Sequence, residues 1–341
     1  MAYTEIDNPE LYFQTKLYTG NGSTQSITLD GSENMQPDWV WLKSRSLATV
    51  NHVYDSVRGA TKRIQTNQTN TEYTEPGALT SFNSNGFSLG NWTSGNGNGA
   101  TFASWNWLAG GTASSNTDGS ITSSVSANTT AGFSIVSYTG NATAGATVGH
   151  GLGTTPSMII AKNRSATGNW RVYHKSLGAN YLIQLDLTGA ALDNTTWNDT
   201  APTSSVFSIS SVADVNGSGN NIIAYCFAEK TGFSKFGSWT SNNNANGTFV
   251  YTGFAPSFVM LKEHDGTNQW VMYDNKRPSY NQTSNALFAN GTSAEATDLG
   301  IDILSNGYKI RATNNQNTGN YIYMAFGQSL VGTNNIPCTA R

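Results

Sequence analysis

A seven-residue segment occurs three times in the chain, and this repetition constrains the fold more than any other feature. Residues 37–43 (PDWVWLK) return as residues 156–162 (PSMIIAK) and as residues 256–262 (PSFVMLK). A tyrosine follows each proline at an identical spacing: Tyr54, Tyr173 and Tyr273. Such internal similarity indicates one supersecondary unit used repeatedly. The 341 residues therefore predict three copies of a unit of about 100 residues, long enough to form a domain core.

Alternation along the repeated segment predicts a strand that is buried on both faces, because successive side chains of a strand point to opposite sides. Trp39 and Trp41 share one face, while Val40 and Leu42 share the other. Both faces are equally apolar in the other copies, with Met158 and Ile160 against Ile159 and Ala161, and Phe258 and Met260 against Val259 and Leu261. We predict that Trp41, Ile160 and Met260 occupy equivalent buried positions, and that the lysine ending each segment emerges at the rim or snorkels to it.

The remaining pattern predicts an all-β chain of three tandem β-sandwich or jelly-roll-like repeats. Each copy closes with an aromatic-rich strand (residues 102–107, 222–227 and 321–326), and Gly- and Asn-rich turns recur without helical periodicity. The predicted divisions are an N-terminal arm (1–15), repeat 1 (16–109), a flexible Gly/Ser/Thr-rich linker (110–130), repeat 2 (131–231), repeat 3 (232–330) and a C-terminal tail (331–341).

Composition argues against several classes of partner. Charged residues make up 11% of the chain, its net charge is −3 and its 18 lysines and arginines are scattered, so nucleic-acid binding is not expected. No apolar run approaches the length of a membrane span, and no secretory signal pattern opens the chain. Cys226 and Cys338 do not form the pattern of a disulfide framework, which favours assembly in a reducing cytoplasm.

Motifs that carry chemistry are mostly missing from the sequence. The four histidines lie in separate segments, and no nucleophile elbow or phosphate loop occurs, so neither an enzyme nor a cofactor is predicted. A carboxylate pair assembled only by folding is the remaining alternative. Oxygen-bearing side chains alternate as in a calcium loop at Asp214, Asn216, Ser218 and Asn220, but no acidic residue completes the shell, so no metal site is predicted.

Aromatic residues in polar surroundings are the candidate binding residues. Trp92, Trp197 and Trp239 lie in polar connections, where a ring either stacks on a sugar or folds back onto its own domain. The N-terminal arm carries Tyr3, Leu11, Tyr12 and Phe13. Either the arm docks the chain to a larger assembly or to a neighbouring subunit, with Tyr12 and Phe13 as anchors, or Leu11 to Phe13 form the first strand of repeat 1.

Several longer stretches carry a family resemblance: PDWVWLKSRS (37–46), YDSVRGATK (54–62), LTSFNSNGFSLG (79–90) and CFAEKTGFSKFGSWT (226–240). With these motifs the chain resembles virion structural proteins of marine, chiefly cyanobacterial, tailed phages, a family of unknown function often described as tail-fibre or tail proteins. The resemblance covers nearly the whole chain, including its last residues (331–341), and it supplies no catalytic residues.

The resemblance implies a virion protein, assembled in the host cytoplasm, with lectin-like sandwiches as its architecture. Its expected role is a tail fibre or tail-associated component that binds host-surface glycans. Its expected partners are other virion proteins, copies of itself, with a homotrimer favoured, and host-surface polysaccharide. A capsid decoration, cement or capsid-fibre protein is the alternative, and a virion-bound glycan depolymerase is a third hypothesis. The chain has neither the heptads nor the short β-helix repeats of a fibre shaft, which argues against the fibre.

Overall fold

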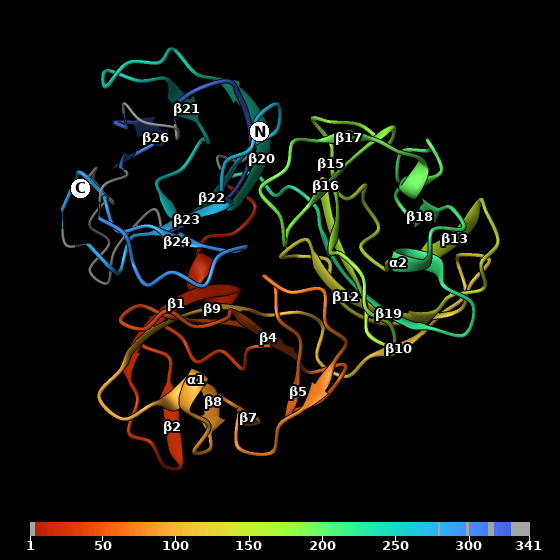
Figure 1. The fold of residues 1–341 in the computed structure, drawn as a ribbon, viewed down its shortest axis with the longest axis horizontal. Coiled ribbons are helices and arrows are strands. Elements are labelled where there is room, and N and C mark those ends of the chain that lie inside the picture. Colours follow the sequence, from red (N-terminus) through yellow and green to blue (C-terminus); the bar gives the residue numbers. More distant parts are fainter. Residues whose placement is uncertain (1–3, 279, 298–299, 313–316, 329–341) are drawn as a thin grey trace.

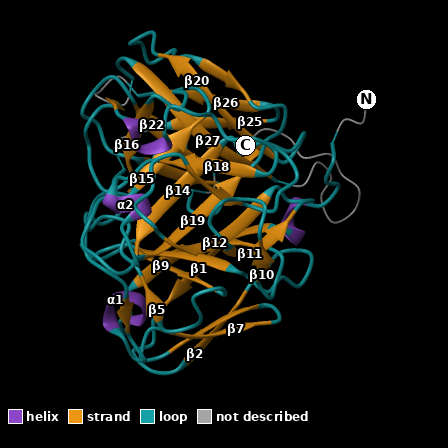
Figure 2. Cartoon of the chain, turned by 90° about the vertical axis from the view of Figure 1, so that its right-hand side faces the viewer, coloured by secondary structure: helices purple, strands orange, loops and turns teal. Residues whose placement is uncertain are grey.

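The chain forms three lobes around a common centre, one lobe for each repeat (Figure 1). The computed structural model describes residues 4–278, 280–297, 300–312 and 317–328. Nearly all regular structure is antiparallel strand, so the predicted all-β sandwich fold is confirmed. The helices are single turns, α1 (Thr93–Asn96) and α2 (Ala213–Asn216), with 3-10 turns η1 (Pro9–Leu11) and η2 (Thr195–Trp197) (Figure 2). Within the described ranges, no helix has the length and apolar character needed to cross a membrane.

Each repeat has two layers, an inner sheet near the common centre and an outer sheet. In repeat 1 the inner order is β1 (Phe13–Thr19), β9 (Thr101–Trp107), β3 (Trp39–Ser44) and β4 (His52–Asp55). Its outer sheet is β2 (Gln25–Thr28), β8 (Gly86–Leu89) and β7 (Leu79–Asn83), and β5 (Lys62–Arg63) pairs with β6 (Tyr73–Thr74).

Repeats 2 and 3 keep this arrangement. The inner sheet of repeat 2 is β10 (Ser114–Asn116), β11 (Ser123–Asn128), β12 (Phe133–Thr139), β19 (Asn221–Phe227), β14 (Met158–Asn163), β15 (Arg171–His174), β16 (Tyr181–Gln184) and β17 (Leu192–Asp193). Its outer pair is β13 (Ala146–Gly149) and β18 (Val206–Ile209). In repeat 3 the inner sheet is β20 (Ser234–Thr240), β27 (Asn320–Gly327), β22 (Pro256–Glu263), β23 (Val271–Asp274) and β24 (Leu287–Phe288), and the outer sheet is β21 (Phe249–Tyr251), β26 (Gly307–Ile310) and β25 (Ile301–Leu304).

Strand register confirms the equivalence predicted from the repeated segment. Trp41 lies opposite Trp105, Ile160 opposite Tyr225, and Met260 opposite Met324, in the same pair of strands of each repeat. The side chains of Trp41, Ile160 and Met260 are all buried. The three central strands β3, β14 and β22 are therefore structural copies of one another.

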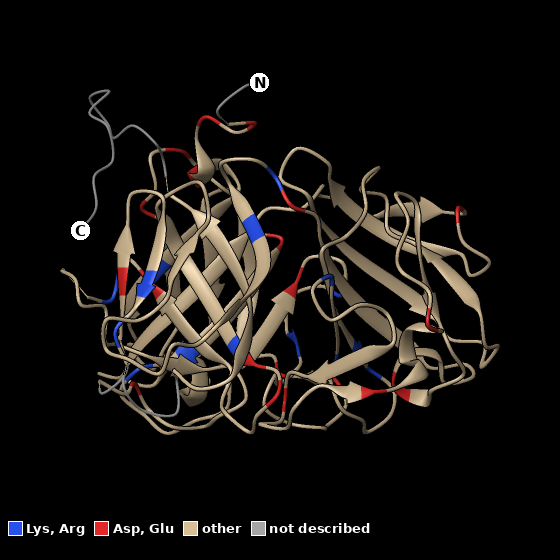
Figure 3. Cartoon of the chain, turned by 90° about the horizontal axis from the view of Figure 1, so that it is seen from above, with Lys and Arg blue, Asp and Glu red and all other residues tan. Residues whose placement is uncertain are grey.

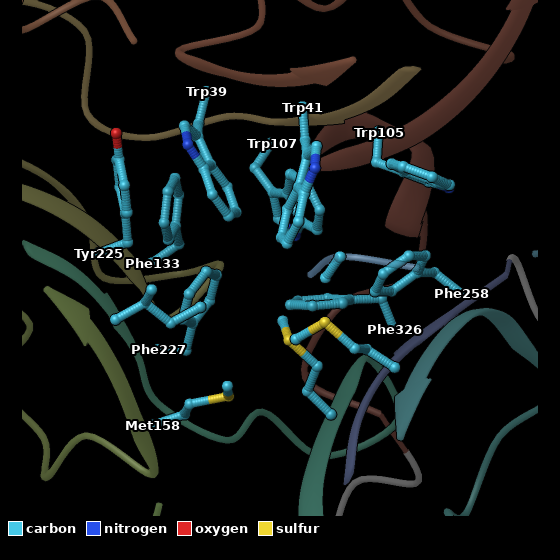
Figure 4. Packing of buried hydrophobic residues seen from close by; sticks show 14 of the residues in the cluster. Trp39, Trp41, Trp105, Trp107, Phe133, Met158, Tyr225, Phe227, Phe258 and Phe326 are labelled. Carbon is cyan, nitrogen blue, oxygen red and sulfur yellow. The ribbon is translucent and has the colours of Figure 1, made fainter. Parts of the chain in front are cut away.

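The two faces of each central strand contribute to different cores. The outward face, for example Val40 and Leu42, packs against the outer sheet of its own repeat. The inward faces of all three repeats meet in one shared core, in which Trp39 packs on Tyr225 of repeat 2 and Trp107 packs on Phe326 of repeat 3. Figure 4 shows these rings converging from three directions. The repeats are thus not independent tandem modules, because each completes the core of the others.

The segment 110–130 is not the flexible linker that its composition predicted. It forms β10 and the whole of β11, which extend the inner sheet of repeat 2, and Ile121 bridges to Val148 in the outer pair. Its Ser and Thr residues suit a strand as well as a linker, and alternate side chains such as Ser123 and Val125 are buried. Pairing with β12 therefore decided the structure of this segment, which its composition left open.

The N-terminal arm also joins the fold, because β1 begins at Phe13, inside the predicted range 1–15. The ring of Phe13 stacks on Phe326 of repeat 3 at a centroid distance of 5.2 Å. Of the predicted first strand Leu11 to Phe13, Phe13 lies in β1, while Leu11 ends η1 and Tyr12 caps it. The C-terminal tail, 331–341, lies outside the described residues.

Truncation in the shared core should destabilise the chain in every repeat. We expect Trp41→Ala, Ile160→Ala and Met260→Ala each to lower the free energy of unfolding by about 2–5 kcal/mol, because each leaves a cavity in the shared core. Urea denaturation measures this change. Leu47→Ala is the control, since Leu47 is 43% exposed, and its expected effect is within about 0.5 kcal/mol. Core variants no less stable than the control would contradict the shared core.

Candidate functional site

The most elaborate polar structure in the molecule lies at the seams, defined here as the contacts between consecutive repeats. The chain after the fourth strand of each repeat (β4, β15 or β23) reaches over to the next repeat. The backbone N–H of Glu72 donates to the carbonyl of Arg164 at 3.1 Å, that of Ala191 to His264 at 2.8 Å, and that of Glu295 to Arg45 at 2.8 Å. Repeat 1 thus contacts repeat 2, repeat 2 contacts repeat 3, and repeat 3 contacts repeat 1, which closes a ring.

A buried lysine occupies the same place in each seam. Lys162 Nζ donates to the carbonyl of Thr69 in repeat 1 at 2.8 Å, and Lys262 Nζ donates to that of Thr188 in repeat 2 at 2.8 Å. Lys43 Nζ donates to the carbonyl of Thr292 in repeat 3 at 3.0 Å. Burial lowers the pKa of all three lysines to about 8. The predicted position at the rim is wrong, because these lysines are at most 1% exposed and their ammonium groups donate to loop carbonyl oxygens.

Buried ion pairs at the other end of the inner sheets accept hydrogen bonds across two of the seams. Asp55 forms an ion pair with Arg58 at 2.5 Å and accepts a hydrogen bond from the hydroxyl of Tyr225 at 2.7 Å. Asp274 likewise pairs with Arg277 at 2.7 Å and accepts from the indole of Trp105 at 3.1 Å. Both ion pairs have side chains that are 0% exposed, so their partners are held in one geometry.

Repeat 2 places His174 where the other repeats have an aspartate. Its Nε2 lies 3.1 Å from the carbonyl oxygen of Tyr323 in repeat 3, and its Nδ1 accepts from the backbone N–H of Ser176 at 3.2 Å. Burial lowers the pKa of His174 to about 4, so the ring is neutral at physiological pH. The two contacts together assign the tautomer protonated at Nε2, which donates to Tyr323.

The seams bind the repeats to each other. Their charged groups are buried and occupied by protein partners, and Figure 3 shows charged residues mainly near strand ends and in connections. In the ranges that the structure describes, no group of three or more His, Cys, Asp and Glu side chains is placed to hold a metal ion. We interpret the seams as the structural centre of the molecule.

Two of the three predicted glycan-binding tryptophans are buried. Trp197 is 1% exposed and packs edge-on against Phe207, and Trp239 is 8% exposed and stacks on Tyr321 at 4.3 Å. Both rings fold back onto their own repeat, so the prediction of sugar-stacking rings is wrong for them. Trp92 is half-buried and retains an accessible part.

The predicted docking residues of the arm act mostly inside the molecule. Phe13 is 2% exposed in the shared core, and Tyr12 packs edge-on against Phe233 of repeat 3 at 6.1 Å. These two rings therefore anchor repeat 1 to repeat 3, and as docking anchors for another subunit they are a wrong prediction. Leu11 is 36% exposed, and Tyr3 lies outside the described residues.

The weak calcium candidate is a structural turn. Asp214 forms an ion pair with Arg171 at 2.6 Å, and Asn216 is buried with its amide donating to the carbonyls of Thr143 and Ser210. Asn96 and Asn317 make the corresponding hydrogen bonds in the other repeats. Asp214 and Asn216 are thus engaged by protein partners, while Ser218 is exposed and Asn220 half-buried, so the four residues do not assemble a metal site.

One cluster escaped the sequence analysis altogether. In repeat 1 the guanidinium carbon of Arg63 lies 4.4 Å from the ring centroid of Tyr73 and 4.7 Å from that of Trp92. His52 lies beside Trp92, with ring centroids 4.4 Å apart. No repeated motif includes Arg63 or Tyr73; only strand pairing, which places Arg63 opposite Tyr73, could have indicated the cluster.

Comparison with known families assigns the chain to one of them. A family model described as a domain of unknown function (DUF7483) matches residues 8–329, which includes all three repeats. The chain belongs to the DUF7483 family. No curated protein and no solved structure is detectably similar to it. The matched range contains all three repeats, so the family model covers the complete ring of this chain and not a single repeat.

The seam lysines give a pH dependence that can be measured. Because burial lowers the pKa of Lys162 to about 8, while an unfolded lysine has a pKa of about 10.4, only the unfolded chain holds this proton between those values. Stability from this group therefore rises with pH in that window. We expect the wild type to gain stability relative to Lys162→Met between about pH 7.5 and about pH 9.5, measured by urea denaturation.

Comparison with Lys162→Met cancels the contributions of tyrosines and of Cys226, which both proteins share. The compared quantity is the free energy of unfolding of the wild type minus that of Lys162→Met. If this difference stays constant or decreases as the pH rises, the amine of Lys162 is not desolvated in the seam.

Proposed function

We propose that this chain is a non-enzymatic structural component of a tailed-phage particle, attached to the tail and contacting glycans on the host surface. The observation that carries the proposal is the closed ring of seams around one shared core, a design suited to rigidity. The resemblance of its motifs to phage virion proteins supplies the setting. The described residues hold no His, Cys, Asp and Glu cluster placed for a metal ion, and the ion pairs Arg45–Glu295 and Arg164–Glu72 join neighbouring repeats.

The arrangement of three similar lobes suits attachment to a particle. An object with approximate threefold symmetry can present equivalent surfaces to a threefold axis of a larger assembly. The lobes present outer sheets and polar loops away from the common centre (Figure 1). Weak contacts made by many copies on one particle would add up to firm attachment, as expected of multivalent binding.

A capsid decoration protein is the second candidate, favoured by the shape of the molecule. The described chain forms compact lobes and contains no coiled coil or elongated shaft (Figure 1, Figure 2). The expected homotrimer stays a prediction in either role. The seams are already used within one chain, so a homotrimer would require contacts through other surfaces.

Copy number per particle distinguishes the two roles. Quantitative mass spectrometry of purified virions, with the major capsid protein as internal standard, measures this number directly. We expect tens of copies or fewer, as for a tail component. Hundreds of copies would establish capsid decoration instead, and absence from the particle would overturn both.

The same proposal predicts that the purified protein does not cleave polysaccharide. We expect no increase in reducing sugar when it is incubated with host lipopolysaccharide or capsule, because the described carboxylates at the seams are paired and buried. A reducing-sugar assay over a pH series makes the test. Release of reducing ends would instead support the depolymerase hypothesis.

A further inference from the structure

The cluster of Arg63, Tyr73 and Trp92 in repeat 1, here called the Arg63 stack, combines a cation with two partly exposed aromatic rings. The guanidinium lies between two aromatic rings, as a cation–π interaction requires. Tyr73 is 37% exposed, and both Arg63 and Trp92 are half-buried, so a ligand can reach the stack from solvent. The rings fix the plane of the guanidinium without using its N–H groups.

The hydrogen-bonding groups of this cluster lack partners. Arg63 Nε and NH1 are buried without a hydrogen bond, as are both ring nitrogens of His52. Arg63 has no carboxylate within 4 Å. The six other arginines in the described ranges each have one: Arg45, Arg58, Arg164, Arg171, Arg277 and Arg311. The positive charge of Arg63 therefore has no carboxylate to balance it within the described residues, which points to an anionic partner from outside the chain.

Comparison between repeats shows that the fold does not need the stack. Strand pairing places Arg63 at the position of Leu182 in repeat 2 and Ala286 in repeat 3, both buried in their sandwich cores. Tyr73 corresponds to Leu192, because Tyr73 pairs with Arg63 and Leu192 pairs with Leu182. Trp92 precedes α1 as Val212 precedes α2. Repeat 1 therefore carries a cation and two rings where repeat 2 has aliphatic side chains.

The comparison also shows which partner is missing. His52 corresponds to Arg171 of repeat 2, whose charge is neutralised by Asp214 on α2. The position of Asp214 is taken in repeat 1 by Ser94 on α1, which carries no charge. Repeat 1 therefore has neither charge of this ion pair, because burial lowers the pKa of His52 and Ser94 is neutral, while Arg63 adds a positive charge that no described carboxylate pairs with. An external carboxylate would restore the balance of charge.

We propose that the Arg63 stack binds an acidic saccharide. A sugar carboxylate approaches the guanidinium of Arg63 from the solvent side of the stack, because its negative charge complements the positive charge of the arginine. The apolar face of the sugar ring packs on the accessible part of Tyr73 or Trp92. This inference deepens the proposed attachment to host glycans and depends on that role only for the natural source of the saccharide.

Isothermal titration of the full chain with tetragalacturonate at low ionic strength tests the proposal. We expect measurable binding by the wild type, and at least about tenfold weaker binding of a neutral tetrasaccharide of glucose. Arg63→Leu and Trp92→Val introduce the residues that repeat 2 carries at these positions. Each should weaken binding of tetragalacturonate by about tenfold or more without lowering the melting temperature.

Arg311→Gln is the matched control, because it removes one positive charge from a partly exposed ion pair in repeat 3. We expect its affinity for tetragalacturonate to equal that of the wild type. Equal weakening by Arg311→Gln would reduce the effect to net charge and overturn the site. Acetate is the second control, and binding of acetate as tight as that of tetragalacturonate would overturn the saccharide part of the proposal.

No binding by the wild type, or unchanged binding by both Arg63→Leu and Trp92→Val, would also overturn the proposal. A fall in the melting temperature of both variants with unchanged affinity would assign the stack a purely structural role. None of these results depends on copy number in the virion, so failure of the site and failure of the proposed particle role are distinguishable.

Discussion

The rest of the structure depends on burial of the inner faces of three sheets against one another. The outer face of each inner sheet is covered by its own repeat, but its inner face has no partner within that repeat. Burial of a large apolar side chain contributes about 1.5–3 kcal/mol, so exposure of rings such as Trp39, Trp107 and Phe258 would be prohibitive. Three sheets facing one centre remove this exposure together (Figure 4). The number of repeats follows from this geometry, since each sheet needs the other two.

The polar groups of the seams determine how the three sheets are oriented. Hydrophobic packing alone is not directional, whereas the lysine-to-carbonyl contacts of Lys43, Lys162 and Lys262 require each connecting loop to lie over the next repeat. These hydrogen bonds offset part of the cost of burying each lysine, and the desolvation that remains lowers the pKa of the amine. Cyclic order is thus specified by polar contacts, while stability comes chiefly from the apolar core.

Much of the fold could be predicted from the sequence, because alternation along the central strand is a local property. That both faces of Trp39 to Leu42 are buried followed from their side chains alone. What lies against each face is decided by contacts distant in sequence, so the shared core was not foreseen. Composition failed where it was ambiguous: Ser- and Thr-rich residues 110–130 form strands, and the rings of Trp197 and Trp239 found partners in their own repeats. The Arg63 stack depends on a pairing outside the repeated motifs, which no periodicity indicates.

Native-state hydrogen exchange of the Met260→Ala variant tests the shared core most directly. Met260 belongs to repeat 3, but its side chain lies in the core to which all three repeats contribute. The account predicts that the free energy of opening falls by the same amount for the amides of β9, β19 and β27, because these strands belong to one cooperative unit. A fall confined to β27, with unchanged protection in β9 and β19, would show that the repeats are independent domains and would contradict the account.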